Sequence, residues 1–142
     1  MYDTILVPID GSDSMQPVVE DAAELAAERD AAVSLLYVVD ERAFLTLADE
    51  RVDEVYEELR SQGEAALTEA AETMAEYGVD AATELRRGDP AEEILAFAEE
   101  IDAALISMGT HARFEDNILG SVSRSVVVQS KIPVLATPIE RQ

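Results

Sequence analysis

Residues 103–123 read AALISMGTHARFEDNILGSVS, and this stretch indicates the kind of fold to expect. Its first four residues form an apolar run typical of a buried strand, and the valines after Gly120 have the spacing of a helix. A glycine-containing connection from a strand to a helix lets backbone N–H groups approach an anion, and the helix N-terminus adds partial positive charge. The stretch therefore predicts a loop that cradles phosphate. The loop alone leaves a second interpretation open, a tight turn followed by a helix cap.

The rest of the chain alternates strand-like and helix-like segments. Further apolar runs predict strands at residues 4–9, 32–39, 81–86 and 133–138. Apolar residues at helical spacing predict helices that include residues 18–26, 49–77, 90–100 and 121–130. Such alternation is typical of an α/β protein with a parallel sheet.

Punctuating residues refine these boundaries. Ser12 and Ser14 offer N-caps ahead of the first helix, and Asp89, Pro90 and Glu92 have the order of an N-cap, a first helical residue and a capping-box carboxylate. Gly63 lies inside the long pattern at 49–77 and costs up to about 1 kcal/mol relative to alanine, so the sequence leaves a bend or break there open.

Two strands are expected at sheet edges. The strand at 81–86 is less apolar than the others, and Pro133 and Pro138 bracket the strand at 133–138. An exposed apolar edge favours pairing with a second chain. We therefore expect a homodimer formed through residues 133–138.

Length and composition narrow the class of protein. The 142 residues suffice for one compact domain, so residues 1–142 are expected to form a single domain. The chain has no apolar run long enough to span a membrane and its start does not resemble a signal peptide, so a cytoplasmic location is expected. The absence of cysteine excludes disulfides and thiolate catalysis, and the single His111 cannot build a histidine metal site.

The charge balance is strongly acidic. Asp and Glu number 31 against 10 Lys and Arg, which gives a formal net charge of -21. Such a surface repels phosphate backbones and argues against a nucleic-acid partner. Lys131 is the only lysine, and high acid content with little lysine resembles proteins from salt-loaded halophilic cytoplasm, where ions screen the repulsion. An ordinary acidic protein from a mesophile is the alternative.

Five short motifs, taken together, resemble the universal stress protein family. They are VPIDGS at 7–12, GDP at 88–90, MGTH at 108–111, LGSVS at 119–123 and PVL at 133–135. Each is weak alone, but their order and spacing match the family over essentially the whole chain. The resemblance implies a doubly wound sheet of five parallel strands in the order 3-2-1-4-5, with helices on both faces, like the adenine nucleotide alpha hydrolases. It also implies a homodimer formed partly through the last strand and, in one branch of the family, an ATP site. From the acidic, lysine-poor composition we expect a member of the family from a halophilic archaeon.

That branch of the family implies roles for particular residues. Pro8 and Val38 would flank the base, Asp10 would bond ribose or adenine, and Met108 and Gly109 would lie under the ribose and phosphates. Phosphate would be held by the residues that end the loop and begin the last helix: Gly120, Ser121, Val122 and Ser123. For Asp10 the alternative is turn chemistry, and Val38 has the simpler role of a sheet-core residue.

The loop departs from the family's nucleotide-binding pattern, which is Gly, two residues, Gly, nine residues, Gly, then Ser or Thr. Ala112 stands at the second glycine, and only seven residues separate it from Gly120. At a position of positive φ, alanine costs roughly 1 kcal/mol or more. Glu115 and Asp116 add negative charge against Arg113, the one cation of the loop, which we include among the binding residues. Weak binding, a need for Mg²⁺ and loss of the site are the three alternatives.

Two function classes follow. The first is a stress-response dimer that binds ATP or another adenine nucleotide, and the second is a dimeric interaction protein that acts without nucleotide. No catalytic residue is expected: His111, Ser121 and Asp116 lack a nucleophile elbow, and a Gly-Lys-Ser/Thr phosphate loop is missing, so ATP hydrolysis would be weak at most.

Overall fold

The computed structural model describes residues 3–110 and 121–139, which build one parallel sheet of five strands. The strands are β1 (Thr4–Ile9), β2 (Ala32–Asp40), β3 (Ala81–Gly88), β4 (Leu105–Thr110) and β5 (Val134–Pro138). Their order in the sheet is β3-β2-β1-β4-β5, and every neighbouring pair runs parallel. This confirms the predicted fold class and places the third and fifth strands at the edges.

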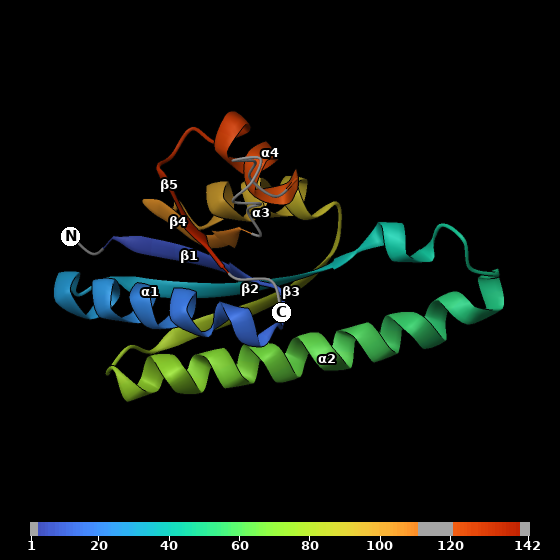
Figure 1. The fold of residues 1–142 in the computed structure, drawn as a ribbon, viewed down its shortest axis with the longest axis horizontal. Coiled ribbons are helices and arrows are strands. Elements are labelled where there is room, and N and C mark those ends of the chain that lie inside the picture. Colours follow the sequence, from blue (N-terminus) through green and yellow to red (C-terminus); the bar gives the residue numbers. More distant parts are fainter. Residues whose placement is uncertain (1–2, 111–120, 140–142) are drawn as a thin grey trace.

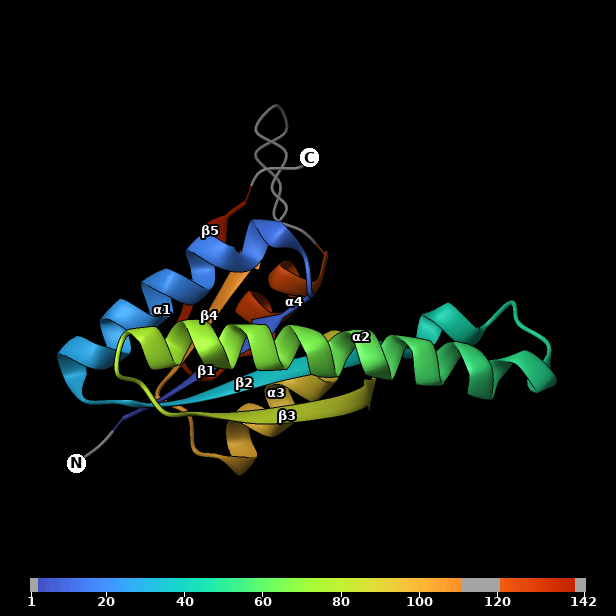
Figure 2. The same cartoon turned by 90° about the horizontal axis from the view of Figure 1, so that it is seen from below.

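Helices cover both faces of the sheet (Figure 1). α1 (Gln16–Arg29) and α2 (Asp49–Glu76) pack on one face, and α3 (Pro90–Glu100) and α4 (Ser121–Gln129) pack on the other. Two short 3-10 turns complete the described elements: η1 (Asp13–Met15) precedes α1, and η2 (Glu41–Phe44) follows β2. Figure 1 shows the sheet between the two helical layers, and Figure 2 looks onto the layer of α1 and α2 with the sheet behind it.

The central strand β1 is buried on both sides, as expected for a parallel sheet. Ile5 and Val7 point into the apolar cluster beneath α1 and α2, while Leu6 points into the cluster beneath α3 and α4. All three side chains are buried. Because neighbouring residues of a strand face opposite sides, this one continuous apolar run supports both layers.

The predicted N-cap and first helical residue of α3 are confirmed. The Asp89 carboxylate accepts a hydrogen bond from the backbone N–H of Glu92 at 3.0 Å, and Pro90 occupies the first turn.

The expected cap of α1 was wrong. Met15 stands at its N-cap with no side-chain hydrogen bond, because η1 separates Ser12 from the helix.

The helix does not break at Gly63, an alternative that the sequence left open. α2 runs through this position without interruption, and Gly63 is buried. A Cβ at position 63 would lie 2.5 Å from Cδ1 of Tyr37 on β2. The glycine therefore serves close packing of α2 on the sheet instead of ending the helix.

The N-terminal part of α2 extends beyond the sheet beside η2 (Figures 1 and 2). Arg87, at the end of β3, lies over two rings there, 4.5 Å from the centroid of Phe44 and 4.9 Å from that of Tyr56. These cation–π contacts connect the projecting segment to the edge strand.

Within residues 3–110 and 121–139, no helix combines the length and apolarity needed to cross a membrane.

Candidate functional site

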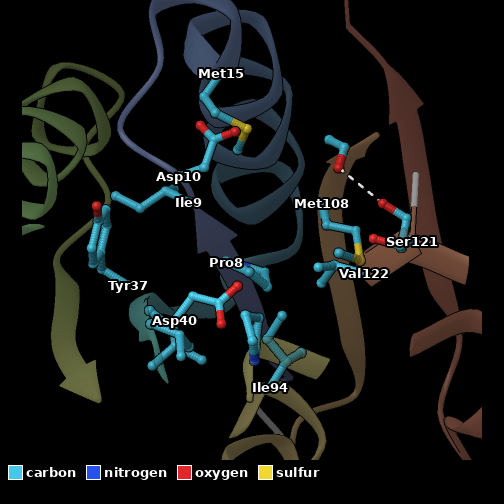
Figure 3. A pocket seen from close by; sticks show the side chains of 15 residues that line it. Pro8, Ile9, Asp10, Met15, Tyr37, Asp40, Ile94, Met108, Ser121 and Val122 are labelled. Atoms are coloured by element: carbon cyan, nitrogen blue, oxygen red, sulfur yellow. Dashed lines mark hydrogen bonds between the residues drawn. The ribbon is translucent and has the colours of Figure 1, made fainter. Parts of the chain in front are cut away.

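A cavity of about 450 Å³ opens at the carboxyl ends of β1, β2 and β4, beside the start of α4 (Figure 3). In doubly wound sheets this edge is the usual place for ligands, at the point where the strand order reverses. Most of the site residues expected from the sequence line it: Pro8, Asp10, Val38, Met108, Gly109, Ser121, Val122 and Ser123. Arg113 and Gly120 lie outside the described residues, as does Ala112, so these remain predictions from the sequence.

Asp10 directly follows β1 and organises the turn that leaves the strand. Its Oδ1 accepts hydrogen bonds from the backbone N–H of Ser12 at 2.9 Å and from the Ser12 hydroxyl at 2.8 Å. Gly11 between them has a φ of +80°, a conformation that glycine adopts without strain. The turn interpretation of Asp10 is therefore correct, and the same residue also lines the cavity.

The apolar wall of the cavity comes from β1, β2 and α3. Pro8, Leu36, Val38 and Ile94 line it together. Leu36 and Ile94 are buried core residues, and Val38 is a partly buried residue packed against the same cluster. Val38 thus belongs to the sheet core and to the cavity wall at once.

Gly109 on β4 has a packing reason to be glycine. A Cβ at this position would lie 3.0 Å from Sδ of Met15 and 3.2 Å from Cδ1 of Ile139. The Ser123 hydroxyl, on α4, donates a hydrogen bond to the Gly109 carbonyl at 3.3 Å. This bond ties the first turn of α4 to β4, so the start of the helix lies at the cavity beside Ser121.

Several lining residues were missed from the sequence: Ile9, Met15, Leu36, Tyr37, Asp40, Pro90 and Ile94. Asp40 had a readable signal. It follows the apolar run of β2 as Asp10 follows that of β1, and the carboxyl ends of parallel strands meet at one edge of a sheet. The other missed residues are apolar or aromatic, and their sequence pattern indicates burial or, for Pro90, the start of a helix.

Asp40 is held by the arginine two residues further along the chain. Nε of Arg42 lies 3.0 Å from each carboxylate oxygen of Asp40, and Nη2 lies 2.6 Å from Oδ2. The backbone N–H of Arg42 donates to Oδ1 at 2.9 Å. The hydrogen bonds from Arg42 lower the pKa of the Asp40 carboxyl below its usual value, so this group stays ionised at neutral pH.

The pKa of Tyr37 is raised, whereas that of Asp40 is lowered. Burial of its ring, and secondly the negative charge of Asp10, raise the pKa of the Tyr37 hydroxyl. The phenol therefore remains protonated at neutral pH.

Among the residues that the structure describes, no group of three or more metal-ligating side chains comes together. Of His111, Ser121 and Asp116, which the sequence did not support as catalytic residues, only Ser121 lies in the described part of the chain.

The topology and the position of the cavity define the class of protein. The chain is a doubly wound α/β protein with an open cavity at the switch point of its sheet. The model of the Universal stress protein family matches residues 1–138, and the chain belongs to that family. The resemblance inferred from the five motifs is thereby confirmed.

Individual relatives agree. Universal stress protein MJ0531 of Methanocaldococcus jannaschii is 39% identical over 138 residues, which cover 95% of this chain and 81% of the relative. Universal stress protein YxiE of Bacillus subtilis is 36% identical over 145 residues, which cover 95% of this chain and 98% of the relative.

Solved structures of the family superpose over the whole chain. The structure of protein MJ0577 matches with a TM-score of 0.84 at 27% identity, covering 100% of this chain and 98% of the other. A universal stress protein from Archaeoglobus fulgidus in complex with dAMP matches with a TM-score of 0.69 at 26% identity, covering 97% and 98%. A universal stress protein in complex with cAMP matches with a TM-score of 0.71 at 26% identity, covering 96% and 97%.

Proposed function

We propose that this protein is a stress-response dimer that binds ATP or another adenine nucleotide in the cavity at the carboxyl ends of β1, β2 and β4. The observation that carries the proposal is the convergence of an apolar slot, a carboxylate and a helix N-terminus on one cavity. Its volume of about 450 Å³ lies within the range of small-molecule sites. The similar structures in complex with dAMP and cAMP support an adenine nucleotide as the ligand.

The strand order suggests how the nucleotide lies. β2, β1 and β4 are consecutive in the sheet, and α4 begins beyond β4. The base occupies the apolar slot between Pro8 and Val38, and the ribose lies near Asp10. The phosphates then reach Ser121 and the N-terminus of α4, where backbone N–H groups and the helix dipole favour an anion.

The acidic surface works against phosphate binding. With a net charge of -21, the protein repels a nucleotide unless salt or a cation screens it. In this proposal Arg113 and a Mg²⁺ ion carried by the nucleotide supply that screening. The same charge, with its shortage of lysine, supports a halophilic cytoplasm as the setting and argues against a nucleic-acid partner.

Calorimetric titration with ATP and Mg²⁺ in molar KCl tests the proposal. We expect saturable binding, and a rise of the unfolding temperature with millimolar ATP because a ligand that binds the folded state stabilises it. Gly120→Val is expected to abolish the binding, since a branched side chain hinders close approach of phosphate to the backbone. Ala112→Gly is expected to leave binding unchanged or strengthen it.

A nucleotide-independent interaction protein is the second candidate. Ala112 and the shortened segment before Gly120 favour it, because they depart from the family's nucleotide-binding pattern. If the wild type and Ala112→Gly both show no binding heat and no thermal protection by ATP, the first proposal is contradicted and this second candidate remains.

A further inference from the structure

Asp40 brings a second carboxylate to the cavity, at the end opposite the start of α4. It ends β2, whereas Ser121 lies beyond β4, and β1 runs between these two strands. In Figure 3 the Asp40 carboxylate points into the cavity toward Pro8 and Ile94, while Ser121 lies across the cavity from it. A molecule that places phosphate at Ser121 and a base in the apolar slot therefore turns an outer edge of that base toward Asp40.

The orientation of this carboxylate is fixed by its neighbour. The guanidinium of Arg42 and its backbone N–H both bond the Asp40 oxygens, at distances from 2.6 to 3.0 Å. The four bonds come from three donors, the backbone N–H, Nε and Nη2, because Nε is shared between the two oxygens. A carboxylate has about four lone-pair sites, so about one site is left for a ligand. The Asp40 side chain is 33% exposed, so it remains accessible to a ligand in the cavity.

An ionised carboxylate accepts hydrogen bonds and donates none. It attracts an amino group on the edge of a base, and it repels a carbonyl oxygen at the same place. Among the residues that the structure describes, the apolar wall beside Asp40 consists of Pro8, Leu36, Val38 and Ile94, which offer no competing polar side chain.

We propose that Asp40 is a specificity-determining residue that accepts a hydrogen bond from the exocyclic amino group of adenine and disfavours bases with a carbonyl there. This inference rests on the proposed function, because it requires the base to lie in the apolar slot. It assigns to Asp40 a role in choosing the nucleotide, which is distinct from holding ribose or phosphate.

The wild-type protein provides the first test. ATP and inosine triphosphate differ at two adjacent atoms of the base: the amino group on C6 of adenine is replaced by a carbonyl oxygen, and N1 gains a hydrogen. We expect ATP with Mg²⁺ to bind about tenfold more tightly than inosine triphosphate in molar KCl, a moderate preference because the carboxylate is partly solvated. Equal affinities would overturn the inference, and a guanine nucleotide that binds more tightly than ATP would overturn it as well.

The second test is Asp40→Asn. Asparagine keeps the shape and is an equally good cap for the backbone of η2, so the fold is expected to survive. Its amide presents either an oxygen or an NH₂ group to the base, and the preference for ATP over inosine triphosphate should fall to about twofold or less. A preference that stays at the wild-type value overturns the inference.

Two controls isolate the effect of the carboxylate at position 40. Glu41→Gln makes the same change in net charge at an exposed neighbour that does not line the cavity, and it should keep the tenfold preference. The double variant Asp40→Asn/Arg42→Gln removes the arginine that Asp40→Asn would release. It should still lack the preference, and a restored preference would overturn the inference by assigning the effect to Arg42.

The outcomes separate this inference from the proposed function. Absence of ATP binding to the wild type contradicts both. ATP binding with the same ratio of affinities in the wild type and in Asp40→Asn contradicts only the role of Asp40.

Discussion

The ring of Tyr37 lies directly against the backbone of Gly63. A Cβ built on Gly63 would stand 2.5 Å from Cδ1 and 2.8 Å from Cε1 of that ring, distances at which something must move. Tyr37 lines the cavity, so the middle of α2 supports one of the residues that shape the site.

We expect Gly63→Ala to destabilise the protein, although alanine favours a helix by up to about 1 kcal/mol over glycine. The clash with Tyr37 opposes that gain, and overpacking of a buried contact costs about 1–3 kcal/mol. Thermal unfolding should show a lower melting temperature. Ser61→Ala, at an exposed position of α2, serves as the control and should be neutral or slightly stabilising. A more stable Gly63→Ala variant would contradict the packing role of the glycine.

This contact illustrates what the sequence could not predict. The spacing of apolar residues located the helix that contains Gly63, because periodicity is a local property. The ring that fills the space beside it comes from another element, so the pattern around Gly63 left a break open where the structure has a continuous helix in close contact with the sheet. Asp89 is the opposite case: its cap on Glu92 is local, and the sequence predicted it correctly.

The candidate site divides in the same way. Asp10, Met108 and Gly109 were implied as site residues by the resemblance to the family, and they do line the cavity. Leu36 and Ile94 were not, because only the three-dimensional arrangement of β2 and α3 distinguishes a cavity wall from ordinary core.

Salt should stabilise this protein. The excess of 21 negative charges produces mutual repulsion, and the Debye length falls from about 10 Å at 0.1 M salt to about 3 Å at 1 M. We expect the melting temperature to rise as KCl increases over this range. A melting temperature that does not change between 0.1 M and molar KCl would contradict the halophilic interpretation.

Arg86 should contribute more to stability than an ordinary surface arginine. It lies 2.7 Å from Glu100, 3.1 Å from Glu84 and 3.6 Å from Glu93, and it stacks 4.6 Å from the ring centroid of Phe97. We expect Arg86→Met to lower the free energy of unfolding by on the order of 1 kcal/mol. Arg29→Met makes the same charge change at an exposed pair 4.0 Å apart and should have little effect. Equal losses in the two variants would contradict this role.

The contribution of Arg86 should also depend on pH. Hydrogen bonds from Arg86 lower the pKa of Glu100 in the folded protein. A carboxyl with a lowered folded pKa stabilises the fold above its ordinary pKa of 4.5, and the effect is lost as pH falls through the folded value. The stability difference between wild type and Arg86→Met should therefore shrink below about pH 4.5 in urea unfolding. A difference that grows toward acid pH would contradict this.

The proposed dimer can be tested at β5. This strand lies at the edge of the sheet, and Leu135 is 45% exposed. We expect Leu135→Glu to give a monomer in light scattering at high salt, because it places a charge on the apolar edge. Leu45→Glu serves as the control. It changes a leucine that is 79% exposed and follows η2, away from β5, and it should leave the dimer intact. A monomeric wild type at micromolar concentration would contradict the dimer itself.

The two roles of Asp10 can be separated by two substitutions. Asp10→Asn keeps an oxygen that can accept the hydrogen bonds from the Ser12 N–H and hydroxyl, whereas Asp10→Ala loses both. We expect Asp10→Asn to weaken ATP binding about fivefold, on the order of 1 kcal/mol, with little change in melting temperature. Asp10→Ala should weaken binding similarly and also lower the melting temperature, because the turn after β1 loses its acceptor. Asp13→Asn, which makes the same change in charge outside this cavity, should bind ATP like the wild type. If Asp10→Asn and Asp10→Ala both bind ATP as the wild type does, Asp10 serves the turn alone.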